Sequence, residues 1–424
     1  MLEAMDADFG LRSRHESLLS DGFTVLQEID HLLKNLPRWM RPERRRTGWL
    51  FWPGRSEVRF QPLGVVGVIA PWNYPVNLAL MPLATAIAAG NHVFLKPSEH
   101  TPATSAWMRA LLEDVFPEER VAVALGGPEV AAAFAGLPFD HLFFTGSTAV
   151  GRRVMAAAAQ NLTPVTLELG GKSPAILGED YPLATFAARI ASGKWLNAGQ
   201  TCIAPDYLLV PQQRMAGVIE ALREEVRRRY PDLAASRDYT RIINHAQYRR
   251  LAAHVADARD RGLAVIELAD PGDRARAEEV RLFPPTLVIE PGDEASVMQE
   301  EIFGPILPIR SYRSLDEAIA WINAHDRPLA LYHFERDAAK VRRVLEETVS
   351  GGVTVNDCLM HIAQESLPFG GVGPSGMGHY HGREGFLTFS KQKAVFYQAR
   401  VSGMALFKPP YGKLADLLVR FLTR

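Results

Sequence analysis

The chain has 424 residues, of which 47% are hydrophobic and 22% charged, and its formal net charge is −1. This length predicts two or three domains, and a chain without a basic excess is not expected to bind nucleic acid. Its 2 cysteines, Cys202 and Cys358, cannot form a disulfide framework, which predicts a reducing, cytoplasmic setting. We expect no secretory signal, and the longest apolar stretch, 78–90, is too short to span a bilayer.

From about residue 60, short β-rich runs alternate with Ala-rich helical runs. Strands are predicted at 65–70, 91–96, 121–125 and 141–145, with helices at 76–89, 104–115 and 149–159. A second α/β region has strands at 164–169, 174–177 and the end of 300–309, and helices at 183–196 and 214–229. Such alternation is typical of parallel sheets covered by helices.

The tail, residues 406–424, has the spacing of an amphipathic helix. Its apolar positions are Leu414, Leu417, Leu418, Phe421 and Leu422, and its basic positions are Lys413, Arg420 and Arg424. Such a helix can lie on a membrane surface or pack on a partner subunit. We favour packing on a partner.

Cys202 closes the segment GQTC at 199–202, in a loop that follows a predicted helix. A thiol is a nucleophile only as the thiolate, and small neighbours leave the backbone open to a substrate. The other interpretation is that Cys202 is a small buried apolar residue, as most free cysteines are. The segment alone leaves both interpretations open.

Glu168 ends an apolar strand run just before Gly170 and Gly171. A half-buried carboxylate there would have a raised pKa and suit a general base. Alternatively, it forms an ion pair with Lys172. The GKS at 171–173 is not a P-loop, because Thr166 stands where that motif requires glycine.

Two further strand ends carry polar residues. The segment 144–148 (FTGST) opens a helix, whose first backbone N–H groups can hold a phosphate. Lys96 and Glu99 follow another strand, where ligands bind in open α/β sheets. Each signal is weak by itself. No metal site is expected, because His379 and His381 offer two ligands at most.

Together these segments closely resemble the aldehyde dehydrogenase superfamily, over roughly residues 6 to 400. The ordered set is PWNYP at 71–75, KPSE at 96–99, FTGS at 144–147, ELGGKSP at 168–174, GQTCIAP at 199–205, EEIFGP at 300–305 and LPFGGVGPSGMG at 367–378. The stretch from Val355 to about 382 and the KPPYGK at 408–413 look most like the class-3 branch, and within it the coniferyl aldehyde dehydrogenases.

The sequence departs from this pattern at two points. It starts within what looks like the second N-terminal helix of the branch. It also has Met81 and Pro82 where many members have a lysine that faces the cofactor. The class-3-like branch shares this second departure, so we do not interpret it as loss of activity.

The resemblance implies NAD(P)-dependent oxidation of an aldehyde to the carboxylic acid. Cys202 would attack the carbonyl and form a thiohemiacetal, the Asn73 amide and the Cys202 N–H would stabilise the oxyanion, and Glu168 would activate water. The branch implies an aromatic or hydrophobic substrate, such as coniferyl aldehyde. Two alternatives stay open: an acylating enzyme that passes the acyl group to CoA, and a non-catalytic homologue with a structural or binding role.

The resemblance also implies a cofactor site for NAD, with NADP as a second cofactor. Lys96 and Glu99 would contact the adenosine ribose, and Gly146 and Ser147 would lie near the pyrophosphate. Glu301 would hold the nicotinamide ribose. Phe303 would lie beside the ring, and Trp72 belongs to the same site.

The implied architecture is α/β, with a Rossmann-like NAD-binding domain, an α/β catalytic domain and a small β-extension for oligomerisation. We expect the NAD(P)-binding domain at 1–45 and 64–170, the catalytic domain at 171–387, the extension at 46–63 and 388–400, and the amphipathic tail at 401–424. A homodimer is expected, because the extension has exposed strand edges.

Overall fold

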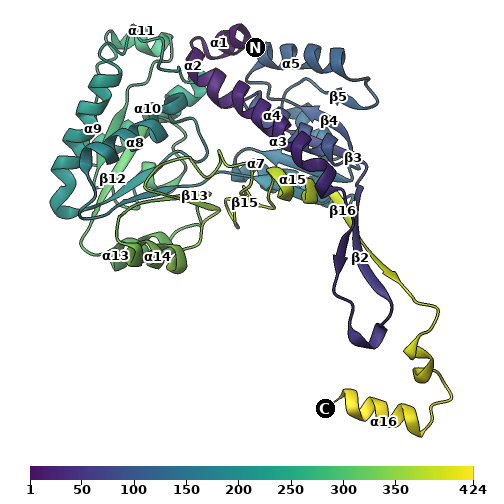
Figure 1. The fold of residues 1–424 in the computed structure, drawn as a ribbon. Helices are drawn as coiled ribbons and strands as arrows, with labels where there is room; N and C mark the ends of the chain where they lie inside the picture. Colours follow the sequence, from purple (N-terminus) through teal and green to yellow (C-terminus); the bar gives the residue numbers. More distant parts are fainter. Residues whose placement is uncertain (424) are drawn as a thin grey trace.

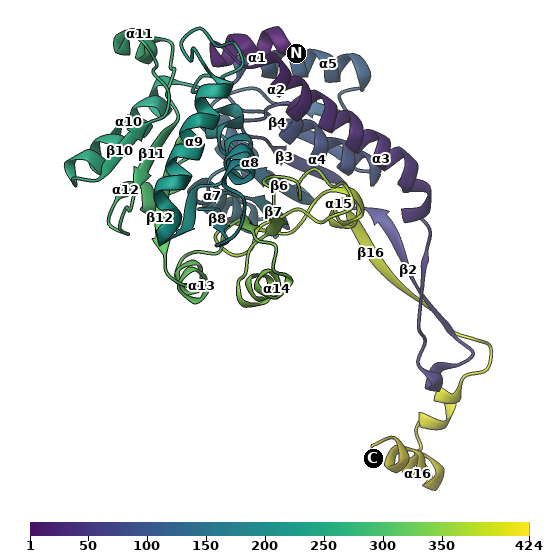
Figure 2. The ribbon, with the colours of Figure 1, turned by 60° about the vertical axis from the view of Figure 1, so that its left-hand side comes forward.

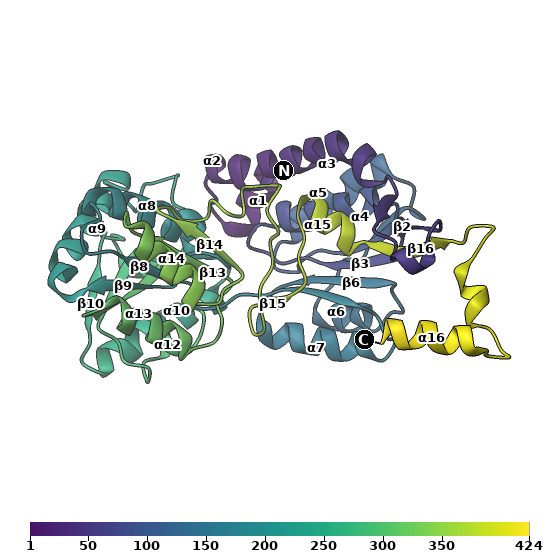
Figure 3. The same ribbon diagram turned by 60° about the horizontal axis from the view of Figure 1, so that its bottom comes forward.

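The computed structural model describes residues 1–423 and consists of two α/β lobes and a long arm (Figure 1). Seen from below, the two lobes lie side by side, and the arm extends from one of them (Figure 3). The side chains of residues 405 and 406 and all of Arg424, a basic position of the predicted tail, lie outside the described part of the chain.

The first lobe is built on a six-stranded sheet. Its strands are, in spatial order, β15 (Gly376–Met377), β7 (Val165–Glu168), β6 (His141–Thr145), β3 (Val65–Ile69), β4 (His92–Lys96) and β5 (Val121–Val123). All pairs are parallel except β15 with β7. Every residue of β6 is buried, which explains the apolar run at 142–144, because parallel strands are covered on both faces.

Helices cover this sheet and connect its strands. They are α4 (Asn77–Ala88), α5 (Pro102–Val115), α6 (Pro128–Ala135) and α7 (Thr148–Ala159), with the N-terminal α1 (Leu2–Phe9), α2 (Arg14–Ser17), the π-helical turn η1 (Leu18–Phe23) and α3 (Thr24–Trp39). Helix α3 buries Val25, Glu28, Leu32 and Trp39 on one side. Residues three to four apart share a helix face, so this burial lays α3 along α4, which it contacts.

The second lobe is built on a seven-stranded sheet. Its order is β10 (Ala264–Glu267), β11 (Thr286–Ile289), β12 (Ile306–Tyr312), β9 (Tyr207–Pro211), β8 (Pro174–Leu177), β13 (Ala330–Phe334) and β14 (Gly352–Val355), and only β10 runs antiparallel to its neighbour. Its helices are α8 (Leu183–Trp195), α9 (Met215–Arg229), α10 (His245–Asp260), α11 (Arg274–Glu279), α12 (Ser296–Gln299), α13 (Leu315–Asn323) and α14 (Ala338–Glu347), with short 3-10 turns η3 (Leu196–Gly199) and η4 (Gln212–Arg214).

The arm is a three-stranded antiparallel ribbon that projects from the first lobe (Figure 2). It consists of β1 (Glu43–Arg45), η2 (Trp49–Phe51), β2 (Arg55–Pro62) and β16 (Ser390–Tyr397), and it continues into η5 (Gly403–Phe407) and α16 (Lys413–Leu422). Strands β2 and β16 pair along their whole length. The preceding α15 (Gly382–Thr388) packs on α3 and α4 and thus anchors the arm to the lobe.

The α/β fold, with two mainly parallel sheets covered by helices, confirms the expected class. Strand pairing places two short strands outside the domains in which we expected them. Residues 43–45 pair with the arm, and residues 376–377 pair with β7 of the first lobe. Among residues 1–423, every helix is too short or too polar to cross a bilayer.

Candidate active site

One cavity of about 1340 Å³ is lined by residues of both lobes. The lobe with the six-stranded sheet contributes residues from the carboxyl ends of β3, β4, β6 and β7, and the other lobe contributes residues that precede β9 and β12. All ten predicted site residues line it, namely Trp72, Asn73, Lys96, Glu99, Gly146, Ser147, Glu168, Cys202, Glu301 and Phe303. Residues from distant parts of the chain therefore meet at a single site, although their roles stay predictions.

The backbone that leads to Cys202 is strained. After α8, three consecutive residues have left-handed conformations: Asn197 (φ 52°), Ala198 (φ 51°) and Gly199 (φ 76°). Each such non-glycine residue costs roughly 1–3 kcal/mol unless its surroundings enforce it. The Gln200 side chain does so, since its amide nitrogen donates to the Asn197 carbonyl at 3.0 Å. This turn brings Cys202 out of the helix and against the cavity.

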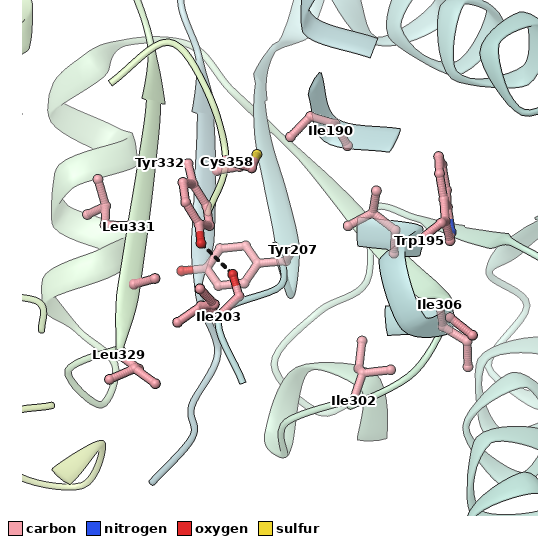
Figure 4. Packing of buried hydrophobic residues seen from close by; sticks show 14 of the residues in the cluster. Ile190, Trp195, Ile203, Tyr207, Ile302, Ile306, Leu329, Leu331, Tyr332 and Cys358 are labelled. Atoms are coloured by element: carbon pink, nitrogen blue, oxygen red, sulfur yellow. Dashed lines mark hydrogen bonds between the residues drawn. The ribbon is translucent and has the colours of Figure 1, made fainter. Parts of the chain in front are cut away.

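The residues after Cys202 are fixed by packing. The Tyr332 hydroxyl on β13 donates to the Ile203 carbonyl, within an apolar cluster that also holds Cys358 (Figure 4). Cys358 is 2% exposed and does not line the cavity, whereas Cys202 is partly exposed and does. Cys358 is therefore a core residue, whereas Cys202 faces the cavity, and its role as the nucleophile stays a prediction.

The surroundings of Cys202 keep it protonated at neutral pH. Burial above all, together with the charges of Glu301 and Glu168, raises the pKa of the Cys202 thiol to about 12, although hydrogen bonds from the backbone N–H groups of Cys202 and Ile203 oppose the rise. To act as a nucleophile, the Cys202 thiol would therefore need a base that takes its proton.

Glu168 ends β7 and is 2% exposed. Neither of its carboxylate oxygens has a hydrogen-bond partner within the described protein, and burial raises its pKa well above the ordinary range. The alternative ion pair with Lys172 is wrong. Lys172 instead pairs with Asp206 and donates to the Val297 carbonyl at 2.7 Å. Glu168 is thus free to exchange a proton in the cavity.

Asn73 follows β3 and lies against the Cys202 loop. Its side-chain nitrogen donates to the Gln200 carbonyl at 3.1 Å. A primary amide has two N–H donors, so a second one is available to a ligand. The neighbouring Tyr74 hydroxyl contacts the Thr201 hydroxyl at 2.6 Å. These contacts hold the amide beside the segment that carries the thiol.

The other end of the cavity carries satisfied charges. The Lys96 ammonium lies 2.7 Å from a carboxylate oxygen of Glu99. Partial burial raises the pKa of Glu99, but the Lys96 hydrogen bond and charge outweigh it and lower that pKa overall. Glu99 is therefore a carboxylate at neutral pH. It can accept hydrogen bonds from a ribose and repel a phosphate.

Between these two ends lie features suited to a phosphate and an aromatic ring. Helix α7 begins at the cavity, and its N-cap residue Ser147 makes no side-chain cap, so the first N–H groups of the helix are left for a ligand. The buried Thr145 hydroxyl beside them has no partner within the described residues. The Trp72 and Phe303 rings meet edge-to-face with centroids 5.3 Å apart.

Glu301 is held by residues that the sequence did not single out. The Gly171 N–H donates to its carboxylate, while burial and the nearby Asp206 raise its pKa to about 8. Asp206 also accepts from the Ile302 N–H at 3.0 Å, and Arg250 donates to the Ile302 carbonyl at 2.6 Å. Arg250 lies in an Arg-rich charged helix, so no sequence signal distinguishes it.

Among residues 1–423, no group of three or more His, Cys, Asp and Glu side chains is arranged to hold a metal ion.

The model of the aldehyde dehydrogenase family matches residues 26–395, and the chain belongs to this family. A probable coniferyl aldehyde dehydrogenase of Pseudomonas aeruginosa is 52% identical over 419 residues, covering 99% of this chain and 87% of the relative. Aldehyde dehydrogenase family 3 member B3 of Mus musculus is 42% identical over 424 residues, covering 99% and 86%. The expected class-3-like branch is thereby confirmed.

Solved structures agree with this assignment. A substrate-bound Staphylococcus aureus AldH superimposes with a TM-score of 0.93 at 40% identity, covering 99% of this chain and 90% of that one. A Mycobacterium tuberculosis aldehyde dehydrogenase complexed with NAD+ has a TM-score of 0.83 at 30% identity, covering 93% and 80%. The chain is thus an enzyme of the aldehyde dehydrogenase class.

Proposed function

We propose that the protein oxidises an aromatic or other hydrophobic aldehyde, such as coniferyl aldehyde, to its carboxylic acid with NAD⁺. The observation that carries this proposal is one cavity that holds Cys202, Glu168 and Asn73 at one end, Lys96 and Glu99 at the other, and the start of α7 between them. A relative named for coniferyl aldehyde supports the substrate class.

A dinucleotide fits the residues that are present. The cavity of about 1340 Å³ exceeds the range of roughly 300–1,000 Å³ that is usual for one small ligand, as an extended cofactor and a substrate together require. Glu99 suits a ribose, the start of α7 and the unpartnered Thr145 hydroxyl suit a phosphate, and Trp72 and Phe303 suit a flat ring. NADP⁺ is the second cofactor we propose, disfavoured by Glu99.

The bound nicotinamide supplies the hydride acceptor, and the chain supplies the rest of the chemistry. Glu168 in its ionised form takes the proton of the Cys202 thiol, and the sulfur attacks the aldehyde carbonyl to give a thiohemiacetal oxyanion. The free N–H of the Asn73 amide and the Cys202 N–H stabilise that oxyanion; losing one such donor typically costs ~3–4 kcal/mol of barrier stabilisation. Loss of the hydride from carbon leaves a thioester on Cys202.

Glu168 then acts a second time. Once it has released its proton to solvent, its carboxylate takes a proton from water, and the resulting hydroxide attacks the thioester. The carbon–sulfur bond breaks, the acid leaves, and Cys202 recovers its proton. Overall, aldehyde, NAD⁺ and water give acid, NADH and a proton. A carboxylate without a fixed partner suits both transfers, since no ion pair has to be broken first.

NADH formation from purified protein tests this proposal. Coniferyl aldehyde and hexanal are each supplied with NAD⁺ or NADP⁺, with and without CoA, and products are identified by mass. We expect the free acid, faster turnover of coniferyl aldehyde, and a preference for NAD⁺. No turnover of either aldehyde would overturn the proposal, and acyl-CoA as the main product would replace it with the acylating reaction.

We further propose a cytoplasmic homodimer in which the arm pairs with a second copy. The exposed edges of the β1–β2–β16 ribbon and the apolar side chains Leu414, Leu417 and Phe421 on α16 support a protein partner. Membrane contact through α16 is the less favoured alternative. Sedimentation with and without residues 401–424 tests assembly, and flotation with lipid vesicles tests the membrane.

A further inference from the structure

The N-terminal segment lies across both lobes. Asp8 accepts hydrogen bonds from the first turn of α5, including the Ala103 N–H at 2.9 Å. Three residues later, the Leu11 carbonyl accepts from the Arg241 N–H of the other lobe at 3.0 Å. The residue that follows, Arg12, therefore enters the protein where the two lobes meet.

The Arg12 guanidinium contacts the loops of both lobes that form the reactive end of the cavity. The residue is 4% exposed. Its Nη1 donates to the Asn73 backbone carbonyl at 2.8 Å and to the Asn197 Oδ1 at 3.1 Å. Its Nη2 donates to Asp21 at 3.0 Å, and the other Asp21 oxygen accepts from the Val76 N–H at 3.1 Å. The Arg12 side chain thus holds the backbone of Asn73 directly and that of Val76 through Asp21.

Asn197 completes this connection. Its Nδ2 donates to the Asn73 carbonyl at 3.0 Å and to the Gln200 carbonyl at 3.1 Å. The same Gln200 carbonyl accepts from the Asn73 side chain. The position of the Asn73 amide relative to the Cys202 loop is therefore set by a closed set of hydrogen bonds, with Arg12 as the one cation in it.

We infer that Arg12 is a positioning residue that aligns the Asn73 amide with the oxyanion formed on Cys202. The inference rests on the proposed function. Lysine is a point charge and cannot reproduce three hydrogen bonds made in two directions by a planar fork. Displacement of a reacting group by about 1 Å can cost roughly 10²-fold in rate, so the alignment is catalytically significant.

Arg12→Lys tests this inference, because it keeps a charge opposite Asp21 and so preserves folding. We expect kcat to fall roughly 10- to 100-fold while the KM for NAD⁺ changes less than about twofold. In an Asn73→Ala background, the same substitution should lower kcat by no more than about twofold, because the group it aligns is gone. The double variant Arg12→Met/Asp21→Asn removes both charges. It should lower kcat in the native background and, like Arg12→Lys, have little further effect in the Asn73→Ala background.

Arg281→Lys is the matched control. Arg281 anchors the same segment by donating to the Phe9 carbonyl at 2.6 Å, but none of its hydrogen bonds is to Asn73 or Asn197. We expect its kcat to stay within about twofold of native. Additive losses in Arg12→Lys/Asn73→Ala, or an equal loss in Arg281→Lys, would overturn the inference alone. A native protein without turnover would overturn the proposed function and this inference with it.

Discussion

The two ends of the cavity treat charge in opposite ways. At the reactive end, Glu168 is 2% exposed and neither of its oxygens has a hydrogen-bond partner among residues 1–423, and Cys202 and Glu301 have raised pKa values. At the recognition end, Glu99 is paired with Lys96 and its side chain is 31% exposed. Proton transfer needs groups whose charge can change, whereas recognition needs groups whose charge is fixed. The proposed function requires both kinds of group, and the two ends of the cavity differ accordingly in burial and in ion pairing.

Substitution of Cys202 at the reactive end should have the largest effect on turnover. Cys202→Ala should lower turnover by at least about 10⁴-fold and change the free energy of unfolding by less than about 1 kcal/mol, since the side chain is small and partly exposed. NADH formation and chemical denaturation measure the two. Cys358→Ala is the control: it removes a core thiol and should leave turnover within a few-fold of native. Turnover that survives in Cys202→Ala would remove Cys202 from the mechanism.

Glu168→Gln should come next. Without this base, ionisation of the Cys202 thiol and hydrolysis of the thioester each slow by roughly 10²- to 10⁴-fold, so we expect a slow first phase of at most one NADH per site and little NADH afterwards. Stopped-flow absorbance resolves the phases. Glu300→Gln changes an exposed carboxylate of the same cavity and should leave the rate unchanged. If Glu168→Gln turned over at the native rate, the unpartnered carboxylate would have no catalytic part.

The raised pKa of Cys202 predicts a smaller, pH-dependent effect. Below that pKa the thiolate fraction rises about tenfold per pH unit, so alkylation of Cys202 by iodoacetamide should accelerate steadily across neutral and mildly alkaline pH. Glu301 ionises at a pKa of about 8 and raises the pKa of Cys202. Glu301→Gln should therefore speed alkylation, and more so above pH 8. A rate that levelled off below neutral pH would mean that Cys202 is a stored thiolate.

The recognition end should give the smallest effect. Glu99→Gln removes the charge that repels a 2′-phosphate and releases Lys96 from its ion pair, so the kcat/KM ratio of NADP⁺ to NAD⁺ should rise by about tenfold, equivalent to ~1.4 kcal/mol. Glu113→Gln, an exposed glutamate on α5, is the control. An unchanged ratio would place the ribose elsewhere.

Much of this architecture could be predicted from local pattern. Strand β6 and the strand ends that precede glycines could be predicted, because apolar runs and the residues that end them are properties of the nearby sequence. The site could be predicted only from all its segments taken together and in order, because each segment alone was a weak signal. The domain membership of the short strands 43–45 and 376–377 could not be predicted, because it depends on the segment with which each strand pairs.

The contacts of Arg12 and Asp206 show where sequence reasoning stops. Arg12 stands in an N-terminal RSR that looks like ordinary surface charge, yet it is buried against residues 61 and 185 positions away. Lys172 is close to Glu168 in the sequence, which made an ion pair between them plausible. Lys172 instead pairs with Asp206, which lies 34 residues after it. Burial and pairing of charges depend on the tertiary fold, which one sequence does not display.

The unpartnered Glu168 also has a thermodynamic consequence. An unfolded chain ionises this carboxyl near 4.5, whereas burial raises its pKa in the fold, so folding above that pH requires uptake of a proton. Stability contributed at low pH is lost as the pH rises toward the raised pKa. A methionine at position 168, apolar and similar in volume, should therefore melt at a higher temperature than the native protein, and more so in alkaline buffer. The carboxyl that we propose to serve catalysis therefore lowers the heat resistance of this fold.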